Sequence, residues 1–172
     1  MINEKMLDAL NKHITRESYS AYLYMSMCAW LGRQDLPGLS KWMRVQAQEE
    51  SCHSLIFFNY VVDQGGKLVL GVVAAPPADF KSPVEVFEKT LAHEREVSAA
   101  IHGLVDVAIK ENDHATRQFL EWFVKEQVEE EATAQNMLAQ LRRIGEGSAL
   151  FLFDKDAGTR AFAVPPPLVG KL

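Results

Sequence analysis

Four long segments of the chain each carry one apolar stripe with the spacing of a helix face. Apolar residues recur every three or four positions from about 3 to 33, 39 to 64, 83 to 110 and 113 to 144. This spacing places one side of each segment in a core, and it predicts four long helices. Turn-forming stretches separate them: QDLPG at 34–38, GG at 65–66, END at 111–113 and GEG at 145–147. Ser82, and either Asn112 or Asp113, are expected to cap the third and fourth helices.

The connections between these segments predict a bundle. The first and second helices, and the third and fourth, are joined by about five residues, which favours antiparallel neighbours. About seventeen residues, including KLVLGVVAAPPADFK, link the second helix to the third. At ~3.3 Å per residue this link could cross the length of a bundle and leave those two helices parallel, although a floppy loop would have the same length.

The end of the chain predicts one more element. A short apolar helix is expected within SALFLFDKDAGTRAF, and three prolines should keep the tail, AVPPPLVGKL, from being helical. The predicted fold class is therefore all-α: a four-helix bundle with one long crossover and a short fifth helix. We expect residues 1–145 to form the bundle, and residues 146–172 to add the short helix and the proline-rich tail to the same domain.

Composition and charge exclude several classes of protein. With 172 residues, 48% of them hydrophobic, one domain can bury a core without a disulfide. The net charge of −5 and the lack of a basic run argue against nucleic acid and anionic membranes as partners. No apolar stretch approaches ~20 residues, and the N-terminus lacks signal-peptide features, so we expect a soluble cytoplasmic protein. Cys28 and Cys52 lie in periodic segments and are expected to be reduced core residues.

Polar residues interrupt all four stripes, and they repeat. Adding 77 to the numbers of Glu17, Glu50 and His53 gives Glu94, Gln127 and Glu130, and the same shift relates Glu49 to Glu126. The two predicted hairpins are thus a repeat whose polar groups lie at matching depths. One buried layer would then hold four carboxylates, one imidazole and one amide.

Such a layer needs neutralisation. Unpaired buried carboxylates cost on the order of several kcal/mol each, and no Lys or Arg occupies a stripe position near this level. The acids must be protonated, hydrated or neutralised from outside the sequence, and a divalent metal is the simplest answer. Oxygen ligands with one histidine are typical of iron or manganese sites, whereas a zinc site would be rich in cysteine. Residues three apart share a helix face, so Glu50 with His53, and Gln127 with Glu130, can each reach one site.

This pattern resembles the ferritin family, of the non-haem bacterial type, over nearly the whole chain. The resemblance is carried by Glu17, the ExxH at 50–53, Glu94, the QxxE at 127–130, Tyr24, Trp122, the crossover and the short fifth helix. Di-iron bundles in general pair two lone glutamates with two ExxH motifs. Here the second motif is QxxE, which fits ferritins better than rubrerythrins or ribonucleotide-reductase-like oxygenases. Bacterioferritins have a haem-ligating Met where this chain has Ser51, so no haem is implied.

The resemblance implies a set of iron ligands. One iron would use Glu17, Glu50 and His53, and the other would use Glu50, Glu94 and Glu130, with Glu50 bridging and Gln127 close by. A third iron would lie beside the pair, with the ligands Glu49, Glu126, Glu129 and Glu130. Tyr24 is either a hydrogen-bond partner or electron donor to the site, or a core residue. Trp122 is expected to serve packing rather than redox chemistry, which is its alternative role. The remaining histidines are expected at the surface or an interface: His13, His93, His102 and His114.

The function implied is iron storage. Fe(II) would be oxidised with O2 or peroxide at a di-iron ferroxidase centre, and Fe(III) mineral would be kept inside a hollow homo-oligomeric cage of 24 subunits. The alternative is a soluble di-iron redox enzyme, of the peroxidase or oxygenase type, without mineral storage. The apolar run Leu150–Phe153 is expected to pack against symmetry mates of the cage.

Overall fold

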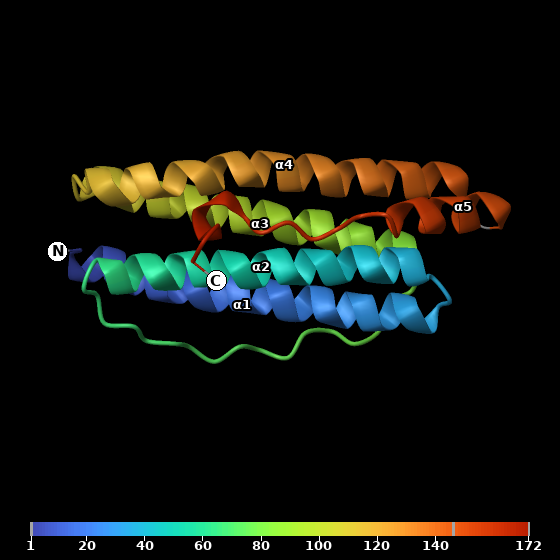
Figure 1. Cartoon of the computed structure of the whole chain (residues 1–172), viewed down its shortest axis with the longest axis horizontal. Coiled ribbons are helices and arrows are strands. Elements are labelled where there is room, and N and C mark those ends of the chain that lie inside the picture. Colours follow the sequence, from blue (N-terminus) through green and yellow to red (C-terminus); the bar gives the residue numbers. More distant parts are fainter. Residues whose placement is uncertain (1, 146, 172) are drawn as a thin grey trace.

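A computed structural model describes residues 2–145 and 147–171, and the part it describes is all-helical (Figure 1). The elements are α1 (Glu4–Arg33), α2 (Pro37–Asp63), α3 (Pro83–Lys110), α4 (His114–Ile144), α5 (Ser148–Ala157) and a 3-10 turn, η1 (Pro166–Leu168). The predicted four long helices and short fifth helix are confirmed. The GEG break falls partly on Glu146, which lies outside the described residues.

Three helix starts follow local capping signals. The side chains of Asn3, Ser82 and Asp113 accept hydrogen bonds from backbone N–H groups in the first turns of α1, α3 and α4. Each cap satisfies an N–H that has no partner inside its helix. Asp113 rather than Asn112 caps α4, because Asn112 has a φ of 54° and lies in the turn.

The start of α2 depends on a distant residue. Asp154 of α5 accepts hydrogen bonds from the backbone N–H groups of Gly38 (3.0 Å) and Leu39 (2.8 Å). A Cβ atom at position 38 would lie 1.7 Å from the Asp154 carbonyl oxygen, so only glycine fits there. α2 therefore begins at Pro37, two residues earlier than predicted, because its cap comes from the other end of the chain.

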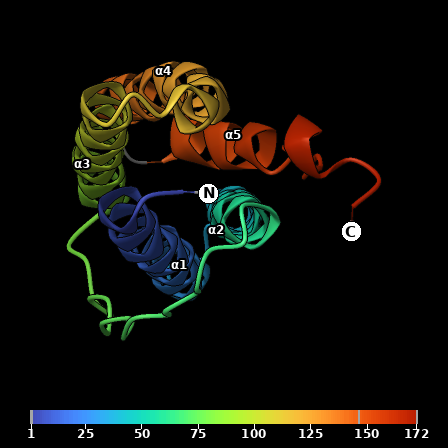
Figure 2. The ribbon, with the colours of Figure 1, turned by 90° about the vertical axis from the view of Figure 1, so that its left-hand side faces the viewer.

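The long link is a crossover and not a floppy loop. It runs along the outside of the bundle beside α1, and it leaves α2 parallel to α3 (Figures 1 and 2). The Asn11 side chain bonds to the backbone of Lys67 and Val69 near one end of α1. Arg33 donates to the carbonyl of Ala78 at the other end, 3.1 Å away. The link thus spans 22 residues of α1, or ~33 Å at 1.5 Å per residue.

The core is divided into two apolar clusters, one toward each end of the bundle. Both clusters draw on all four long helices, and they include Tyr24, Leu39 and Phe87 at one end and Leu10, Phe57 and Phe123 at the other. Between them lies the middle of each helix, where the polar residues interrupt the stripes. Cys28 and Cys52 are buried and free, as predicted.

The C-terminal segment packs against α2. α5 ends at Ala157, before the end of the segment predicted to be helical, and the chain then runs beside α2 to η1 (Figure 1). The prolines do exclude α-helix, but two of them lie in the 3-10 turn η1, which was not predicted. Leu168 is buried in the apolar cluster that contains Phe57.

The apolar run of α5 is shared between the core and the surface. Leu150 and Phe153 are partly buried and pack against the core of their own chain, and the expected contact of the run with symmetry mates stays a prediction. Phe151 and Leu152 remain 69% and 64% exposed. Among the described residues, no helix combines the length and the apolar character needed to cross a membrane.

Candidate metal centre

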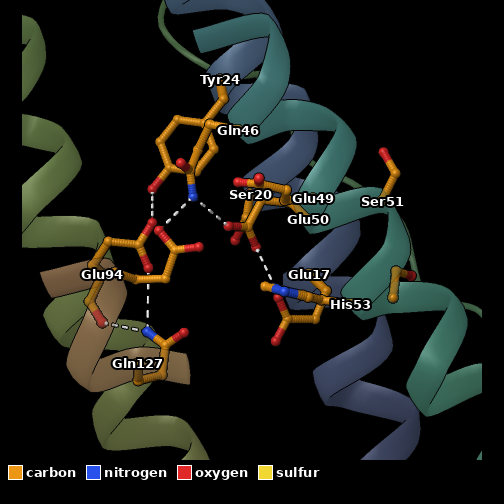
Figure 3. A network of polar contacts seen from close by, with 12 residues as sticks. Glu17, Ser20, Tyr24, Gln46, Glu49, Glu50, Ser51, His53, Glu94 and Gln127 are labelled. Atoms are coloured by element: carbon orange, nitrogen blue, oxygen red, sulfur yellow. Dashed lines mark hydrogen bonds and ion pairs between the residues drawn. The ribbon is translucent and has the colours of Figure 1, made fainter. Parts of the chain in front are cut away.

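The polar layer lies between the two apolar clusters, and each long helix contributes to it (Figure 3). α1 supplies Glu17, α2 supplies Glu50 and His53, α3 supplies Glu94, and α4 supplies Gln127 and Glu130. All six side chains are buried. The 77-residue repeat therefore corresponds to a real layer, because equal offsets from the turns of two similar hairpins bring equal depths in the bundle.

Three of these residues form a group that could hold one metal ion. Ligand atoms of Glu17, Glu50 and His53 all lie within 4.8 Å of one another. His53 Nδ1 is 3.4 Å from Glu50 Oε2. A divalent ion bound at ~2.1 Å separates opposite ligands by ~4.2 Å, so small side-chain adjustments would let one ion contact all three.

Unpaired polar atoms support a cation at this position. Among the described residues, four buried side-chain nitrogen or oxygen atoms have no hydrogen-bond partner, and all belong to this region: both carboxylate oxygens of Glu17, His53 Nε2 and His13 Nε2. Two of the four, His13 Nε2 and Glu17 Oε1, lie 2.6 Å apart, so Glu17 Oε2 and His53 Nε2 are the atoms left without any close partner. Native proteins leave few buried polar groups unsatisfied, and such groups call for an explanation. Carboxylate oxygens and an imidazole nitrogen are groups that iron or manganese would satisfy.

Glu94 and Glu130 are held by amide and hydroxyl donors instead. The Tyr24 hydroxyl donates to Glu94 Oε1, and Gln127 Nε2 donates to Glu94 Oε2 at 3.2 Å. Gln46 Nε2 donates to Glu130 Oε2 at 2.7 Å and to Glu50 Oε1 at 3.2 Å. The amide of Gln46 thus lies between two carboxylates of the predicted second iron position.

The pKa values follow from burial and from the crowding of charge. Burial, together with the charges of Glu94 and Glu17, raises the pKa of Glu50 well above its usual range, although His53 opposes this shift. Burial and the neighbouring Glu130 raise the pKa of Glu94 to about 7. Burial lowers the pKa of His53, but the charge of Glu50 outweighs it and raises that pKa to about 10. The layer therefore retains protons at neutral pH, and binding of cations would release them.

The pKa values of Glu17 and Tyr24 are shifted in opposite directions. Burial raises the pKa of Glu17, but the charges of His13 and His53 outweigh it, so the pKa is lowered. Glu17 is therefore the carboxylate most ready to meet a cation. Burial and the charge of Glu94 raise the pKa of Tyr24 well above its usual range, which keeps its hydroxyl a donor to Glu94.

The residues predicted for a third ion lie at the edge of the layer. Glu49 and Glu126 are half-buried, and Glu129 is exposed. Burial raises the pKa of Glu49 to about 7 against the opposing charge of Arg160, and the charges of Glu130 and Glu126 contribute to the rise. Burial also raises the pKa of Glu126. Glu49, Glu126 and Glu130 thus influence one another electrostatically, whereas Glu129 faces solvent.

Two residues that contact the layer were not predicted from the sequence. The repeat does not single out Gln46, because the 77-residue shift relates it to Phe123 and not to another polar group. Arg160 comes from the segment after α5, and its guanidinium contacts Gln46 and Glu49. No Lys or Arg was expected at a stripe position near this level, and Arg160 instead reaches the outer edge of the layer from outside the four stripes.

The prediction for the histidines is wrong for two of the four. His13 and His93 are buried, whereas His102 and His114 are exposed as predicted. His13 Nε2 lies 2.6 Å from Glu17 Oε1, although without hydrogen-bond geometry, because residues four apart share a helix face. His93 Nε2 lies 2.8 Å from Ser20 Oγ. Trp122 packs edge-on against the ring of His53, with 5.5 Å between the ring centroids.

Known proteins are similar to this chain over most of its length. The model of the ferritin-like domain family matches residues 7–144. A bacterial non-heme ferritin of Bacteroides fragilis (strain 638R) is 40% identical over 160 residues, which cover 93% of this chain and 100% of the relative. One of Staphylococcus aureus (strain MRSA252) is 38% identical over 163 residues, covering 94% and 98%.

Solved structures of ferritins are also similar to this chain. An open pore ferritin of the archaeon Archaeoglobus fulgidus matches with a TM-score of 0.92 and 46% identity, over 94% of this chain and 99% of that one. An engineered closed form of that ferritin matches with a TM-score of 0.92 and 47% identity, over 95% and 100%. The chain thus belongs to the ferritin family, and the bacterial non-heme ferritins are among its relatives.

Proposed function

We propose that this protein stores iron. It oxidises Fe(II) with O2 or peroxide at the polar layer and keeps the Fe(III) product as mineral inside a closed cage of 24 identical chains. The observation that carries the proposal is the buried group of Glu17, Glu50 and His53, whose ligand atoms converge and include unpaired carboxylate and imidazole atoms. Family membership supports iron as the metal.

Binding of the substrate begins at this group. The first Fe(II) ion would take Glu17, Glu50 and His53 as ligands, and Glu17, with its lowered pKa, offers an ionised carboxylate at once. Oxygen ligands with one imidazole suit Fe(II), and a carboxylate environment favours the higher charge of Fe(III). Oxidation would therefore be helped by the same residues that bind the ion.

The second Fe(II) ion would bind between Glu50, Glu94 and Glu130. Gln46 would have to release the two carboxylates to which it donates, at 2.7 Å and 3.2 Å. Tyr24 and Gln127 both donate to Glu94, and so would keep its carboxylate turned into the layer (Figure 3). Glu50 would bridge the two ions.

Two ions held together allow a two-electron reaction. Each Fe(II) gives up one electron, so the pair reduces one O2 molecule, which takes up two protons and leaves as hydrogen peroxide. Peroxide as oxidant would take the same two electrons and two protons and form two water molecules. The protons displaced from the raised-pKa carboxylates on metal binding lie close to the place where they are consumed.

The cage is proposed from the family and from the surface of α5. The curated relatives are named ferritins, and the exposed Phe151 and Leu152 offer apolar surface to a symmetry-related chain. Gel filtration after aerobic addition of Fe(II) tests the proposal. A large particle that carries the iron with it is expected. A monomer or dimer that retains no iron would favour the alternative, a di-iron redox enzyme without storage.

A further inference from the structure

Arg160 makes three contacts with one face of α2. Its Nη1 donates to Gln46 Oε1 at 2.8 Å, and its Nη2 pairs with Glu49 Oε2. Its guanidinium lies over the ring of Trp42, 4.2 Å from the ring centroid. Positions 42, 46 and 49 follow helical spacing, so a single planar side chain from the C-terminal segment can meet all three.

The contact with Gln46 determines which way this amide faces. Arginine can only donate, so the oxygen of Gln46 must be the atom that meets Nη1. The amide nitrogen is then turned to the layer, where it donates to Glu130 and Glu50. Arg160 thus orients a donor to two predicted iron ligands while it neutralises a third acid, Glu49.

The pair of Arg160 and Glu49 lies largely out of solvent. Their side chains are 22% and 18% exposed, so water and salt screen their attraction less than that of a surface pair. A metal ion bound to Glu49 would need the same carboxylate, and it would meet the positive guanidinium at close range. The guanidinium and an ion at this position therefore exclude each other.

We propose that Arg160 is a built-in cation that competes with a third metal ion for Glu49, so that the C-terminal segment limits occupancy of the outer metal position. The inference rests on the proposed function, because it takes Glu49 as a ligand of the third ion. Arg160 is a positioning residue in this scheme, since it acts through Glu49 and Gln46. It lies in the non-helical segment that follows α5, so the side chain can leave Glu49 without unfolding a helix.

Equilibrium binding of Fe(II) without oxygen tests the proposal, because it needs neither oxidation nor mineral. In the parent protein we expect two tightly bound ions per chain and a weaker third. Arg160→Gln should tighten the third ion by about tenfold or more, the effect of removing a positive charge ~4 Å from a bound cation. The first two affinities should change by less than about threefold, since an amide at position 160 can still donate to Gln46.

Three further variants locate the effect. Arg160→Lys keeps the charge and should leave the third ion weak. Arg33→Gln removes one positive charge from an exposed pair with Asp79, and should change nothing. Adding Glu49→Gln to Arg160→Gln should abolish the gain. Unchanged or weaker third-ion binding in Arg160→Gln would overturn the inference alone, whereas a parent chain that binds no Fe(II) would overturn the proposed function as well.

Discussion

The amide nitrogen of Gln46 on α2 lies 2.7 Å from Oε2 of Glu130 on α4. A neutral side chain of one hairpin thus holds a carboxylate of the other across the polar layer. The same nitrogen donates to Glu50, so this one group links two ligands predicted for the second iron. A second iron ion would replace the hydrogen bond of Gln46 with Glu130, which joins the two hairpins.

Replacing this amide should destabilise the metal-free protein more than the loaded one. Gln46→Leu leaves two buried carboxylates without their donor, at a cost of roughly 1–3 kcal/mol in the free energy of unfolding. Two bound ions would supply the missing partner, so the loss should shrink once Fe(II) is added without oxygen. Denaturant unfolding with and without Fe(II) measures both values. An equal loss in the two states would show that the amide and the metal do not share ligands.

The stability of the metal-free protein should fall between pH 6 and pH 8. The pKa values of Glu49 and Glu94 are raised to about 7 from the usual 4.5, so the folded state keeps protons that the unfolded state has lost, and stability declines as pH rises through this range. The pKa of His53 is raised to about 10, so its contribution to the stability of the folded state is fully present below pH 6.5. That contribution is lost as pH rises toward 10. The pKa of Glu17 is lowered, so Glu17 changes the stability of the folded state only at pH values below this range.

Thermal unfolding of the metal-free protein at pH 6 and pH 8 measures this trend. The melting temperature should be lower at pH 8, because all three groups act in the same direction. Fe(II) added without oxygen should raise it more at pH 8 than at pH 6, since the ligands bind metal when deprotonated. A higher melting temperature at pH 8 in the absence of metal would contradict the account.

A negative charge at position 127 should slow release of the product. When metal binding has displaced their protons, Glu17, Glu50, Glu94 and Glu130 supply four negative charges, which would balance two Fe(II) ions. Gln127→Glu would add a fifth, beside Glu94, and a charge pair ~4 Å apart interacts by roughly 4 kcal/mol at an effective dielectric constant of 20. Fe(III) would then be held longer, so the first fast oxidation should persist and recovery for a second round should slow.

Successive small additions of Fe(II), each followed by its oxidation rate, measure this recovery. Gln140→Glu adds the same charge to the exposed face of α4 and should recover as the parent does. Equal second-round rates in Gln127→Glu and the parent would show that the neutral amide serves only its hydrogen bonds to α3.

A charge on the exposed face of α5 should weaken the proposed cage. Deleting residues 148–172 should loosen or leak it, but that deletion also removes the Asp154 cap of α2. Phe151→Asp is the sharper change, because Phe151 is 69% exposed in the single chain. Smaller particles or faster loss of stored iron are expected by light scattering and iron assay. Lys155→Gln, on the same helix, should leave both as they are.

Periodicity alone predicted most of the bundle and most of the layer. A helix face fixes which residues point inward, and the repeat of 77 fixes their depth, so Glu17 and Glu94 could be placed in one layer from sequence. The length of the link correctly predicted a crossover along the bundle, because ~33 Å of α1 had to be spanned.

Contacts between distant segments could not be predicted in this way. Asp154 caps α2 and Arg160 meets Glu49 from outside the four stripes, and neither leaves a local pattern. His13 was misplaced for a different reason. It lies one turn before Glu17, a spacing that puts both side chains on one helix face, but an isolated histidine without a repeat partner is more typical of a surface.

The rate of the first Fe(II) oxidation in Glu50→Ala tests the proposed di-iron centre most directly. In the parent protein, mixing Fe(II) with O2 should give a fast phase that ends at two iron ions per chain. Glu50→Ala removes the bridge between both ions, and the fast phase should slow at least ~100-fold, more than loss of an outer partner causes. Gln48→Ala, exposed on the same helix, should keep it. A fast phase of two ions per chain that survives in Glu50→Ala would contradict the account.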